Sequence, residues 1–567
     1  MTSEAVTGAA TDVGMLVARA RAAQRQYEGW SQAQVDLAVL AAGWAIIEPA
    51  RNRELAELAV ADTGIGNVED KVRKNHRKTF GLLRDLRGAP SVGVIAEDPA
   101  RGIVEIARPV GVVCAITPST NPGATPANKI INALKGRNAV VVAPSPKGWT
   151  TCARLVGFIH AELERIGMPS ALARDLVQVL PSPVTRQATA ELMDYSERRL
   201  RAEIRELPDG EYSASMLVED DGVTADPFEI KVTIVIDGDE IIADFTGTSP
   251  QVRGPMNCTV VVVASAIYNA VFSITDPHTT IPRNSGCYRP VKFIAPAGSV
   301  VNVVHPGPCV GGNTDLQPKL IDLLLKAFSE AVPERAAAAS GGSSSNFLFG
   351  GVHPVTKSYY TNYHFDGHGT GGTMLKDGND GEITRHSNCR NTPIEVFEGR
   401  YPFRNLEYRL KQDSGGPGEH RGGLSTTRTL EVVADEITLS CLFDRAKIPG
   451  WGVFGGHAGG KSQLLVKRAG DDTFRTFVEA FHTVSPTKFT NVLLKRGDIV
   501  RYVTPGGGGY GNPLRRDPEL VLADVRNGWV SPAAATRDYG VVIEERDDDF
   551  AIDAAATAEL RAARSAA

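Results

Sequence analysis

The 567-residue sequence has few cysteines, no long apolar run and no excess of basic charge, and each shortage excludes a class of protein. Its 7 cysteines include no CxxC pair and provide no disulfide framework, which fits a reducing compartment. The longest apolar run, Thr259 to Ile274, is too short to span a bilayer and contains Asn269. With 61 basic and 66 acidic residues, the net charge of -5 argues against nucleic acid as a partner. Residues 1–20 lack the pattern of a secretion signal, so we expect a cytoplasmic protein with no nucleic-acid or membrane partner.

Histidine and glycine are unevenly distributed, which predicts two regions in the chain. Residues 1–193 hold 2 of the 11 histidines and 16 of the 57 glycines, and residues 194–567 hold the others. The first region alternates helical and strand-like stretches, whereas the second is rich in short strands and in loops of glycine, proline and asparagine. We therefore expect one domain over residues 1–193 and another over residues 194–567.

The first region predicts an α/β fold with a partial Rossmann-like sheet. Amphipathic helices are expected at Ala18–Trp30, at Ala33–Thr63 with a kink or break at Pro49, and at Asn67–Arg87. Short apolar strands then alternate with helices, a pattern typical of a parallel sheet with helices on both faces. The expected elements are Ile103–Ala107, Gly111–Thr117, Pro126–Lys135, Asn138–Ala143, Thr150–Ile166 and Leu176–Leu180.

Two polar loops directly follow neighbouring strands of the first region. One runs from Thr117 to Pro122 and the other from Ala143 to Lys147. Ligands bind at the carboxyl ends of strands in an open parallel sheet, so an asparagine amide there could face an oxyanion and a lysine a ribose or phosphate. The glycine fingerprint of a dinucleotide site is absent, and a plain turn explains the same residues.

The string ARPVGVVCAITPSTNP, followed by KIINALKGRNAVVVAPSPKG, resembles the N-terminal part of CoA-acylating aldehyde dehydrogenases of the sulfoacetaldehyde type. The resemblance extends over about residues 10–192. It implies that Asn121 is the amide facing a thiohemiacetal oxyanion and that Thr117, Ser145 and Lys147 lie near NAD(P). The second cofactor loop and the catalytic cysteine of that family do not follow, so hydride transfer by this chain alone is not expected.

Two cysteines of the first region are candidate nucleophiles. Cys114 lies in an apolar strand and Cys152 lies early in a helix. A thiol nucleophile needs a lowered pKa and access to substrate, so we expect both residues to be small buried hydrophobes instead.

The second region predicts a large β-rich α+β fold. Apolar and polar residues alternate over Tyr212–Asp220 and Phe228–Phe245, with a hairpin signal at Asp237-Gly238. Further strands are expected at Leu430–Ser440, Lys461–Lys467 and Asp498–Thr504, and helices at Asp194–Glu206, Leu316–Val332 and Pro518–Asn527. The glycine run from Thr504 to Gly511 resembles a phosphate loop, but no Lys-Ser/Thr follows, so a tight packing loop is the favoured interpretation.

Several strings of the second region resemble the hydantoinase B/oxoprolinase family in order and approximate spacing. They are DFTGTSPQVRGPMN, GCYRPVKFIAPAGSVVN, GGNTD, NCRNTPIEVFEGRYP, DSGGPGEHRGGL, TPGGGGYGNPLRRDPELVLADVRNGWVSP and RDYGVV. The resemblance covers roughly residues 194–543. It implies ATP-dependent opening of a cyclic amide such as a hydantoin or lactam, or carboxylation of a ketone. It also implies an oligomer with a hydantoinase A-like partner, which uses ATP to phosphorylate the substrate, while the B-type component completes the reaction at a metal site.

The family's metal-binding motifs, of the THLPD and HHAD kind, are not found, and the dehydrogenase-like region occupies their place. A replacement site is conceivable at His364, Asp366 and His368, which would share one face of a strand, with His386 nearby. Two imidazoles and a carboxylate suit a divalent metal of the zinc or manganese type. A polar strand or loop lining a substrate cleft explains the same residues.

Four further residues are candidates for substrate-lining groups. Asn313 belongs to the GGNTD string, and Asn391, Thr392 and Glu395 belong to NTPIE. These side chains could line a pocket, and formation of a structural turn is an equal alternative.

Three functions remain open on the sequence alone. The first is a hydantoinase B/oxoprolinase-type component, impaired by the replacement of its metal-binding half. The second is an acylating aldehyde dehydrogenase that uses NAD(P) and CoA. The third is a catalytically inert fusion of two fragments.

Overall fold

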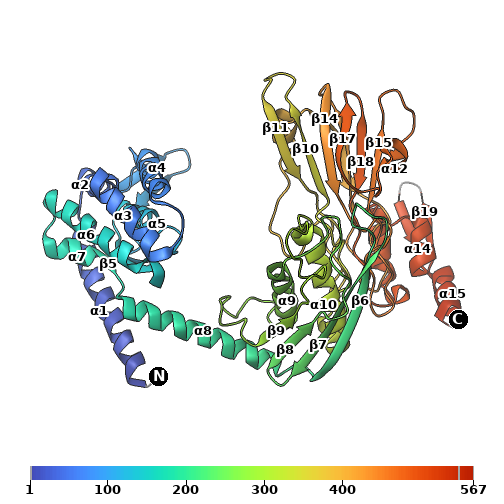
Figure 1. Ribbon diagram of the computed structural model, residues 1–567, viewed down its shortest axis with the longest axis horizontal. Coiled ribbons are helices and arrows are strands. Elements are labelled where there is room, and N and C mark those ends of the chain that lie inside the picture. The colour runs from blue at the N-terminus through green and yellow to red at the C-terminus, as the bar shows by residue number, and fades with distance from the viewer. Residues whose placement is uncertain (1–2, 547–548, 566–567) are drawn as a thin grey trace. The chain divides into compact units, whose positions relative to one another are not determined.

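The computed structural model describes residues 3–546 and 549–565, with side chains described from Val13 onward. The chain divides into two compact units at Met193 and Asp194 (Figure 1). Helix α8 (Ser182–Ile204) crosses the division. Each unit has its own hydrophobic core.

The first unit begins with helices, namely α1 (Ser3–Glu28), α2 (Gln32–Ile47), α3 (Pro49–Thr63) and α4 (Val68–Leu86). Pro49 occupies the first turn of α3, where its missing N–H costs nothing, and the axes of α2 and α3 differ by 62°. The predicted break at Pro49 is therefore confirmed. Among the described residues no single helix is long and apolar enough to cross a membrane, and only the bent α2–α3 pair meets that test of length and composition.

A parallel three-stranded sheet, ordered β3-β4-β5, lies at the centre of the first unit. Its strands are β3 (Val112–Thr117), β4 (Ala139–Pro144) and β5 (Val177–Val179). Helix α5 (Ala124–Lys135) follows β3, while α6 (Trp149–Arg165) and α7 (Ser170–Leu176) follow β4. A separate antiparallel pair, β1 (Gly93–Asp98) and β2 (Ile103–Ala107), precedes the sheet. The α/β prediction is confirmed, but Ile103–Ala107 belongs to the antiparallel pair and not to the parallel sheet, and β1 was missed.

The second unit starts with a four-stranded sheet that shares one hydrophobic core with two helices (Figure 1). The strands are β6 (Gly210–Val218), β7 (Phe228–Asp237), β8 (Glu240–Asp244) and β9 (Val291–Ile294), and the helices are α9 (Val260–Thr275) and α10 (Gln317–Ala331). Gly238 has a φ of 58° in the turn between β7 and β8, which confirms the predicted hairpin.

Two further sheets face each other as a β-sandwich. One is ordered β11-β10-β14-β17, with bounds Tyr359–His364, Asn346–Val352, Glu436–Leu442 and Lys488–Lys495. The other is ordered β12-β13-β18-β15-β16, with bounds Phe403–Leu410, Thr426–Val432, Ile499–Val503, Gln463–Lys467 and Arg475–Thr476. The single strand expected at Leu430–Ser440 is wrong, because β13 and β14 belong to different sheets and the chain crosses between them after Val432.

The remaining elements of the second unit are short. They are α11 (Ile394–Arg400), α12 (Phe477–Phe481), α13 (Pro518–Arg526), α14 (Pro532–Tyr539), β19 (Ile543–Arg546), β20 (Asp549–Ile552) and α15 (Ala554–Ser565). Helices α13 and α14 share a small core with the β19–β20 pair.

Buried glycine segments pack backbone against backbone within the second unit. The N–H of Gly507 donates to Gly423 O at 3.0 Å, and the N–H of Gly508 donates to Ala339 O at 2.8 Å. A Cβ atom on Gly507 would lie 1.8 Å from the carbonyl oxygen of Thr370. The run from Thr504 to Gly511 is thus the packing loop that its composition predicts.

We expect Gly507→Ala to destabilise the protein by roughly 3 kcal/mol or more, because neighbouring backbone rather than a flexible side chain occupies the space of the new methyl group. Urea unfolding of the full chain measures the effect. Gly399→Ala in α11 is the matched control, since nothing lies within 4 Å of that position. Equal stability of the two variants would contradict this prediction.

Candidate functional site

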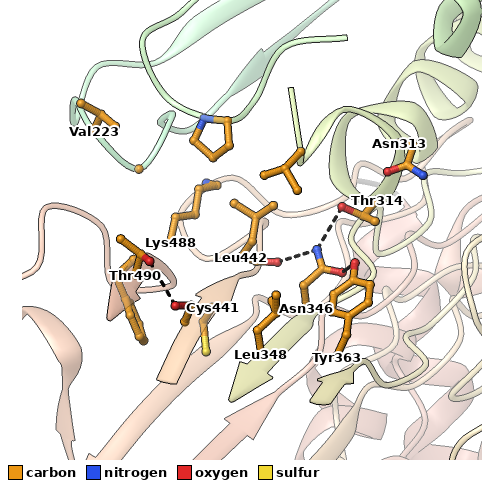
Figure 2. Close-up of a pocket in the computed structure, with 15 residues that line it drawn as sticks. Val223, Asn313, Thr314, Asn346, Leu348, Tyr363, Cys441, Leu442, Lys488 and Thr490 are labelled. Atoms are coloured by element: carbon orange, nitrogen blue, oxygen red, sulfur yellow. Dashed lines mark hydrogen bonds between the residues drawn. The ribbon is translucent and has the colours of Figure 1, made fainter. Parts of the chain in front are cut away.

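The second unit contains a cavity of about 610 Å³ beside the sheet β11-β10-β14-β17. The π-helical turn η2 (Gly312–Leu316) supplies another part of the wall (Figure 2). Most of the lining is apolar, with a few polar side chains, which is the usual character of a small-molecule site. The lining residues are Gly222, Val223, Pro255, Val310, Asn313, Thr314, Asn346, Leu348, Tyr363, Ser440, Cys441, Leu442, Lys488, Phe489 and Thr490.

Turn η2 forms where glycine allows the backbone to approach its neighbours closely. A Cβ atom on Gly312 would lie 2.5 Å from the carbonyl oxygen of Asn257. The turn exposes Asn313 and Thr314 to the cavity and buries Asp315 completely. Isolated π-helical turns are rare and are frequent at functional sites.

Asn346, the first residue of β10, organises the polar wall of the cavity. Its Nδ2 donates to Asp315 Oδ2 at 2.5 Å and to Thr314 Oγ1 and Leu442 O at 3.1 Å each. Its Oδ1 accepts a hydrogen bond from the Tyr363 hydroxyl at 2.5 Å (Figure 2). These partners determine the orientation of the amide, because the flipped amide would place its oxygen against a carboxylate.

Asp315 lies behind this wall in a fully buried position. Its carboxylate accepts hydrogen bonds from the hydroxyls of Ser343 at 2.6 Å and Thr314 at 2.8 Å. Burial raises the pKa of Asp315 from 3.8 to about 6, although nearby Lys319 favours the ionised form. Lys319 itself is held by the carbonyl oxygens of Asp315 and Gly342 at 2.8 and 2.7 Å.

A buried network of charged side chains extends from Lys319 to Lys488 in the cavity wall. Lys319 Nζ lies 2.7 Å from Asp444 Oδ2, and Lys488 Nζ lies 3.1 Å from Asp444 Oδ1. Lys488 also lies 3.4 Å from Glu219 Oε1 and 3.3 Å from Asp220 Oδ1. Burial opposes ionisation of Asp444, but Lys319 and Lys488 hold its pKa well below the usual range. The network joins α10, β17 and the segment after β6, and so fixes the position of Lys488 in the cavity wall.

A second polar cluster surrounds the predicted metal ligand Asp366. Arg428 donates to Asp366 Oδ2 through Nε at 2.7 Å and to Oδ1 through Nη2 at 2.9 Å. Tyr502 Oη donates to Oδ2 at 2.5 Å, and Asn391 Nδ2 donates to Oδ1 at 2.7 Å. Burial opposes ionisation, but the neighbouring His364 and the charge of Arg428 hold the pKa of Asp366 well below its usual range. This carboxylate is the acceptor of a bidentate ion pair.

The predicted metal site therefore needs correction. His364 Nε2 lies 3.7 Å from Asp366 Oδ2, while His368 Nδ1 is hydrogen-bonded to Gly369 O at 2.9 Å. Burial lowers the pKa of His368 to about 4, and burial likewise lowers the pKa of His386. Within residues 3–546 and 549–565, no three His, Cys, Asp or Glu side chains form a group that could hold a metal ion. The residues present do not fit a metal, because the cation beside Asp366 is Arg428.

The predicted substrate-lining residues lie in different places. Asn313 lines the cavity. Asn391 instead donates to Asp366 and, at 2.8 Å, to the Tyr408 hydroxyl. Thr392 is half-buried just before α11, and Glu395 is exposed in the first turn of that helix.

Sequence reasoning missed Tyr363, Asn346, Thr314 and Lys488 as cavity residues. Tyr363 directly precedes His364, the first of the predicted metal ligands, so that prediction fell one residue short of the side chain that lines the cavity. Thr314 follows the predicted Asn313 in the GGNTD string. No local pattern identifies Asn346 or Lys488, because their partners are distant in sequence.

The two predicted loops of the first unit meet at one edge of its parallel sheet. Thr117 pairs in register with Pro144, and the N–H of Ser145 donates to Thr117 O at 2.9 Å. Thr117 is buried, Ser145 is half-buried and Lys147 is exposed. Asn121 is half-buried in the segment that leads from β3 into α5. Its backbone carbonyl accepts a hydrogen bond from the N–H of Thr125.

The two cysteines of the first unit differ in exposure. Cys152 is fully buried, and burial raises the pKa of its thiol to about 12. Cys114 is exposed, which corrects the expectation for that residue. The face of β3 that carries Cys114 and Ile116 is uncovered, with Ile116 74% exposed.

Comparison with known proteins assigns the chain to a family. Residues 151–513 match the family described as hydantoinase B/oxoprolinase. The chain belongs to the hydantoinase B/oxoprolinase family. Residues 2–194 match the aldehyde dehydrogenase family, so this hydantoinase B/oxoprolinase chain also carries a dehydrogenase-like segment. Both resemblances inferred from the sequence are confirmed.

Among relatives of the hydantoinase B/oxoprolinase region, the B component of a putative D-/L-hydantoinase from a Pseudomonas species is 33% identical, over 72% of this chain and 68% of the relative. The crystal structure of ATP-dependent caprolactamase from Pseudomonas jessenii superposes with a TM-score of 0.58 and 28% identity, over 73% of this chain and 68% of that one. The dehydrogenase-like region is 69% identical to sulfoacetaldehyde dehydrogenase (acylating) of Cupriavidus necator, over 33% of this chain. The chain spans only 37% of that dehydrogenase.

The raised pKa of Asp315 makes a prediction for stability. Because the folded pKa of about 6 exceeds the ordinary 3.8, the folded state binds the proton more tightly, and this stabilisation is complete below pH 4 and lost as pH rises through 6. We expect the unfolding free energy of Asp315→Asn minus that of the native chain to rise by roughly 2 kcal/mol between pH 4 and pH 7. Urea unfolding across this range measures the difference, and a difference independent of pH would refute the assignment.

Proposed function

We propose that this chain is the B-type component of an ATP-dependent hydrolase of cyclic amides and acts with a hydantoinase A-type partner. The cavity of about 610 Å³, within the region that matches the family, is the observation that carries the proposal. The relatives support it, since one is named for D-/L-hydantoins and another for caprolactam, which are small rings that contain an amide. A lining of apolar side chains with a few polar groups suits such rings.

The division of labour follows from amide chemistry. An unactivated lactam is a poor electrophile, and phosphorylation of its oxygen by a partner that uses ATP creates a leaving group. The present chain would bind and orient the ring, because its cavity combines an apolar lining with fixed hydrogen-bonding groups. No step is assigned to a metal, because the side chains around Asp366 do not fit one. Carboxylation of a ketone is the related reaction to be tested alongside ring opening.

The proposal is tested by mixing the full chain with a hydantoinase A-type partner, ATP and a series of lactams, hydantoins and ketones. ADP release together with ring opening is the expected result. Leu348→Trp should reduce the rate about a hundredfold, because the indole would enter the cavity from β10 and displace the ring. Val352→Trp on the same strand is the control, since Val352 is 57% exposed and lies outside the lining of this cavity.

Absence of ADP release and of product across all three substrate classes would reject the proposal. The aldehyde dehydrogenase candidate and a catalytically inert fusion of two fragments would then remain. Equal loss of activity in Leu348→Trp and Val352→Trp would instead reject the cavity as the site.

A second candidate function, an acylating aldehyde dehydrogenase, is favoured by the 69% identity of the first unit to sulfoacetaldehyde dehydrogenase. The loops that contain Thr117, Asn121, Ser145 and Lys147 follow strands whose carboxyl ends lie side by side, which is where such sheets bind nucleotides. This candidate predicts binding of NAD(P)H by the first unit.

Titration of the full chain with NADPH, followed by nucleotide fluorescence, tests this second candidate. We expect Lys147→Ala to weaken binding about tenfold through loss of one charged contact to phosphate or ribose. Lys78→Ala, at another exposed lysine of the same unit, should leave binding unchanged. No fluorescence change with the native chain would reject this candidate.

A further inference from the structure

Asn346, Thr314 and Tyr363 form one wall of the cavity. Their hydrogen-bond donors are bonded within the protein, and their oxygens remain as acceptors for a ligand. Both hydrogens of Asn346 Nδ2 are directed at Asp315, Thr314 and Leu442. The Thr314 hydroxyl donates to Asp315 Oδ2 at 2.8 Å. The hydrogen of Tyr363 is directed at Asn346 Oδ1. A ligand that reaches this wall therefore meets oxygen lone pairs.

Tyr363 is the member of this wall that reaches the cavity from β11 (Figure 2). Its ring carries a single hydroxyl, whose hydrogen is engaged with Asn346, so the oxygen is left as an acceptor. Burial raises the pKa of Tyr363 to about 12, which keeps the phenol protonated and the hydrogen bond to Asn346 in place at neutral pH.

Several other side chains of the lining, on β10, β14 and β17, are apolar or bonded to one another. Leu348, Leu442 and Phe489 offer no hydrogen-bonding side-chain atoms. Ser440 and Thr490 share a hydrogen bond at 3.1 Å, and the N–H of Asn491 donates to Ser440 Oγ at 3.1 Å. Of these groups the Asn346 wall best satisfies a donor on the ligand, with the amide of Asn313 in the adjacent turn η2 as a further polar group of the lining. A buried donor without a partner is costly.

We infer that Tyr363 Oη accepts the ring N–H of a cyclic amide in this cavity and makes the site select amides with a free N–H over N-alkylated ones. The inference rests on the proposed function, because it assumes a cyclic amide as the occupant. An N-alkyl group would both remove the donor and press a methyl group against the Tyr363 oxygen. A site built around a hydrogen bond discriminates strongly against a ligand that lacks it, because the polar group of the site is then left unpaired.

Direct binding without ATP or partner tests the inference separately from activity. The probes are ε-caprolactam and N-methylcaprolactam, titrated into the full chain and followed by ligand-observed NMR. We expect the N-methyl compound to bind about tenfold more weakly. A fully buried hydrogen bond would discriminate more strongly, but Tyr363 is 46% exposed, so water can partly replace the lost partner.

Tyr363→Phe should bind the two compounds with equal affinity, since it removes the acceptor and keeps the ring. Tyr359→Phe is the matched control on the same strand, because Tyr359 is 76% exposed and outside the cavity lining, and it should keep the native preference. Discrimination that persists in Tyr363→Phe would overturn the inference, as would failure of the native chain to bind caprolactam. A chain that discriminates in binding but shows no turnover with partner and ATP would leave the inference standing and reject the proposed hydrolase activity.

Discussion

Close packing of glycine backbone is the constraint on which the second unit depends. The carbonyl oxygen of Thr370 occupies the space that a side chain on Gly507 would need, and the oxygen of Gly423 does the same at Gly369. Main-chain hydrogen bonds then join these segments to Ala339. The segment that continues from Ala339 leads through Ser343 to Asn346, so the packing of glycines positions the two residues that hold Asp315 at the cavity wall.

Buried charge is the second constraint, and it acts through mutual neutralisation. Lys319 and Lys488 are at most 2% exposed and share Asp444, while Arg428 is paired with a fully buried Asp366. Removing charges from water is costly, so each of these groups requires its partner in good geometry. The same pairing explains why the polar strand that ends at His364 does not provide metal ligands. The carboxylate that would bind a cation already binds a guanidinium from β13.

Local signals predicted local structure well. Pro49 ended one helix and began another, Asp237-Gly238 formed a hairpin, and the glycine run at 504–511 packed as a loop, because each outcome is decided by backbone conformation at one place. Predictions that required a distant partner were less successful. Asp366 meets Arg428 62 residues away, and Asn346 meets Leu442 96 residues away, so neither contact has a signature in its own stretch of sequence. The apolar pattern of Leu430–Ser440 was continuous across two strands, and only the assembled sheets show that the chain changes layer there.

The position of β3 in the first unit has a consequence for handling the protein. This strand is at the edge of its sheet, and its six residues include no lysine or proline to discourage strand addition. Exposed apolar groups at Ile116 and Val110, 74% and 83% accessible, lie within and beside it. At high protein concentration the exposed edge of β3 can therefore pair with a strand of another copy. A charged substitution at this edge is the first change to try for crystallisation.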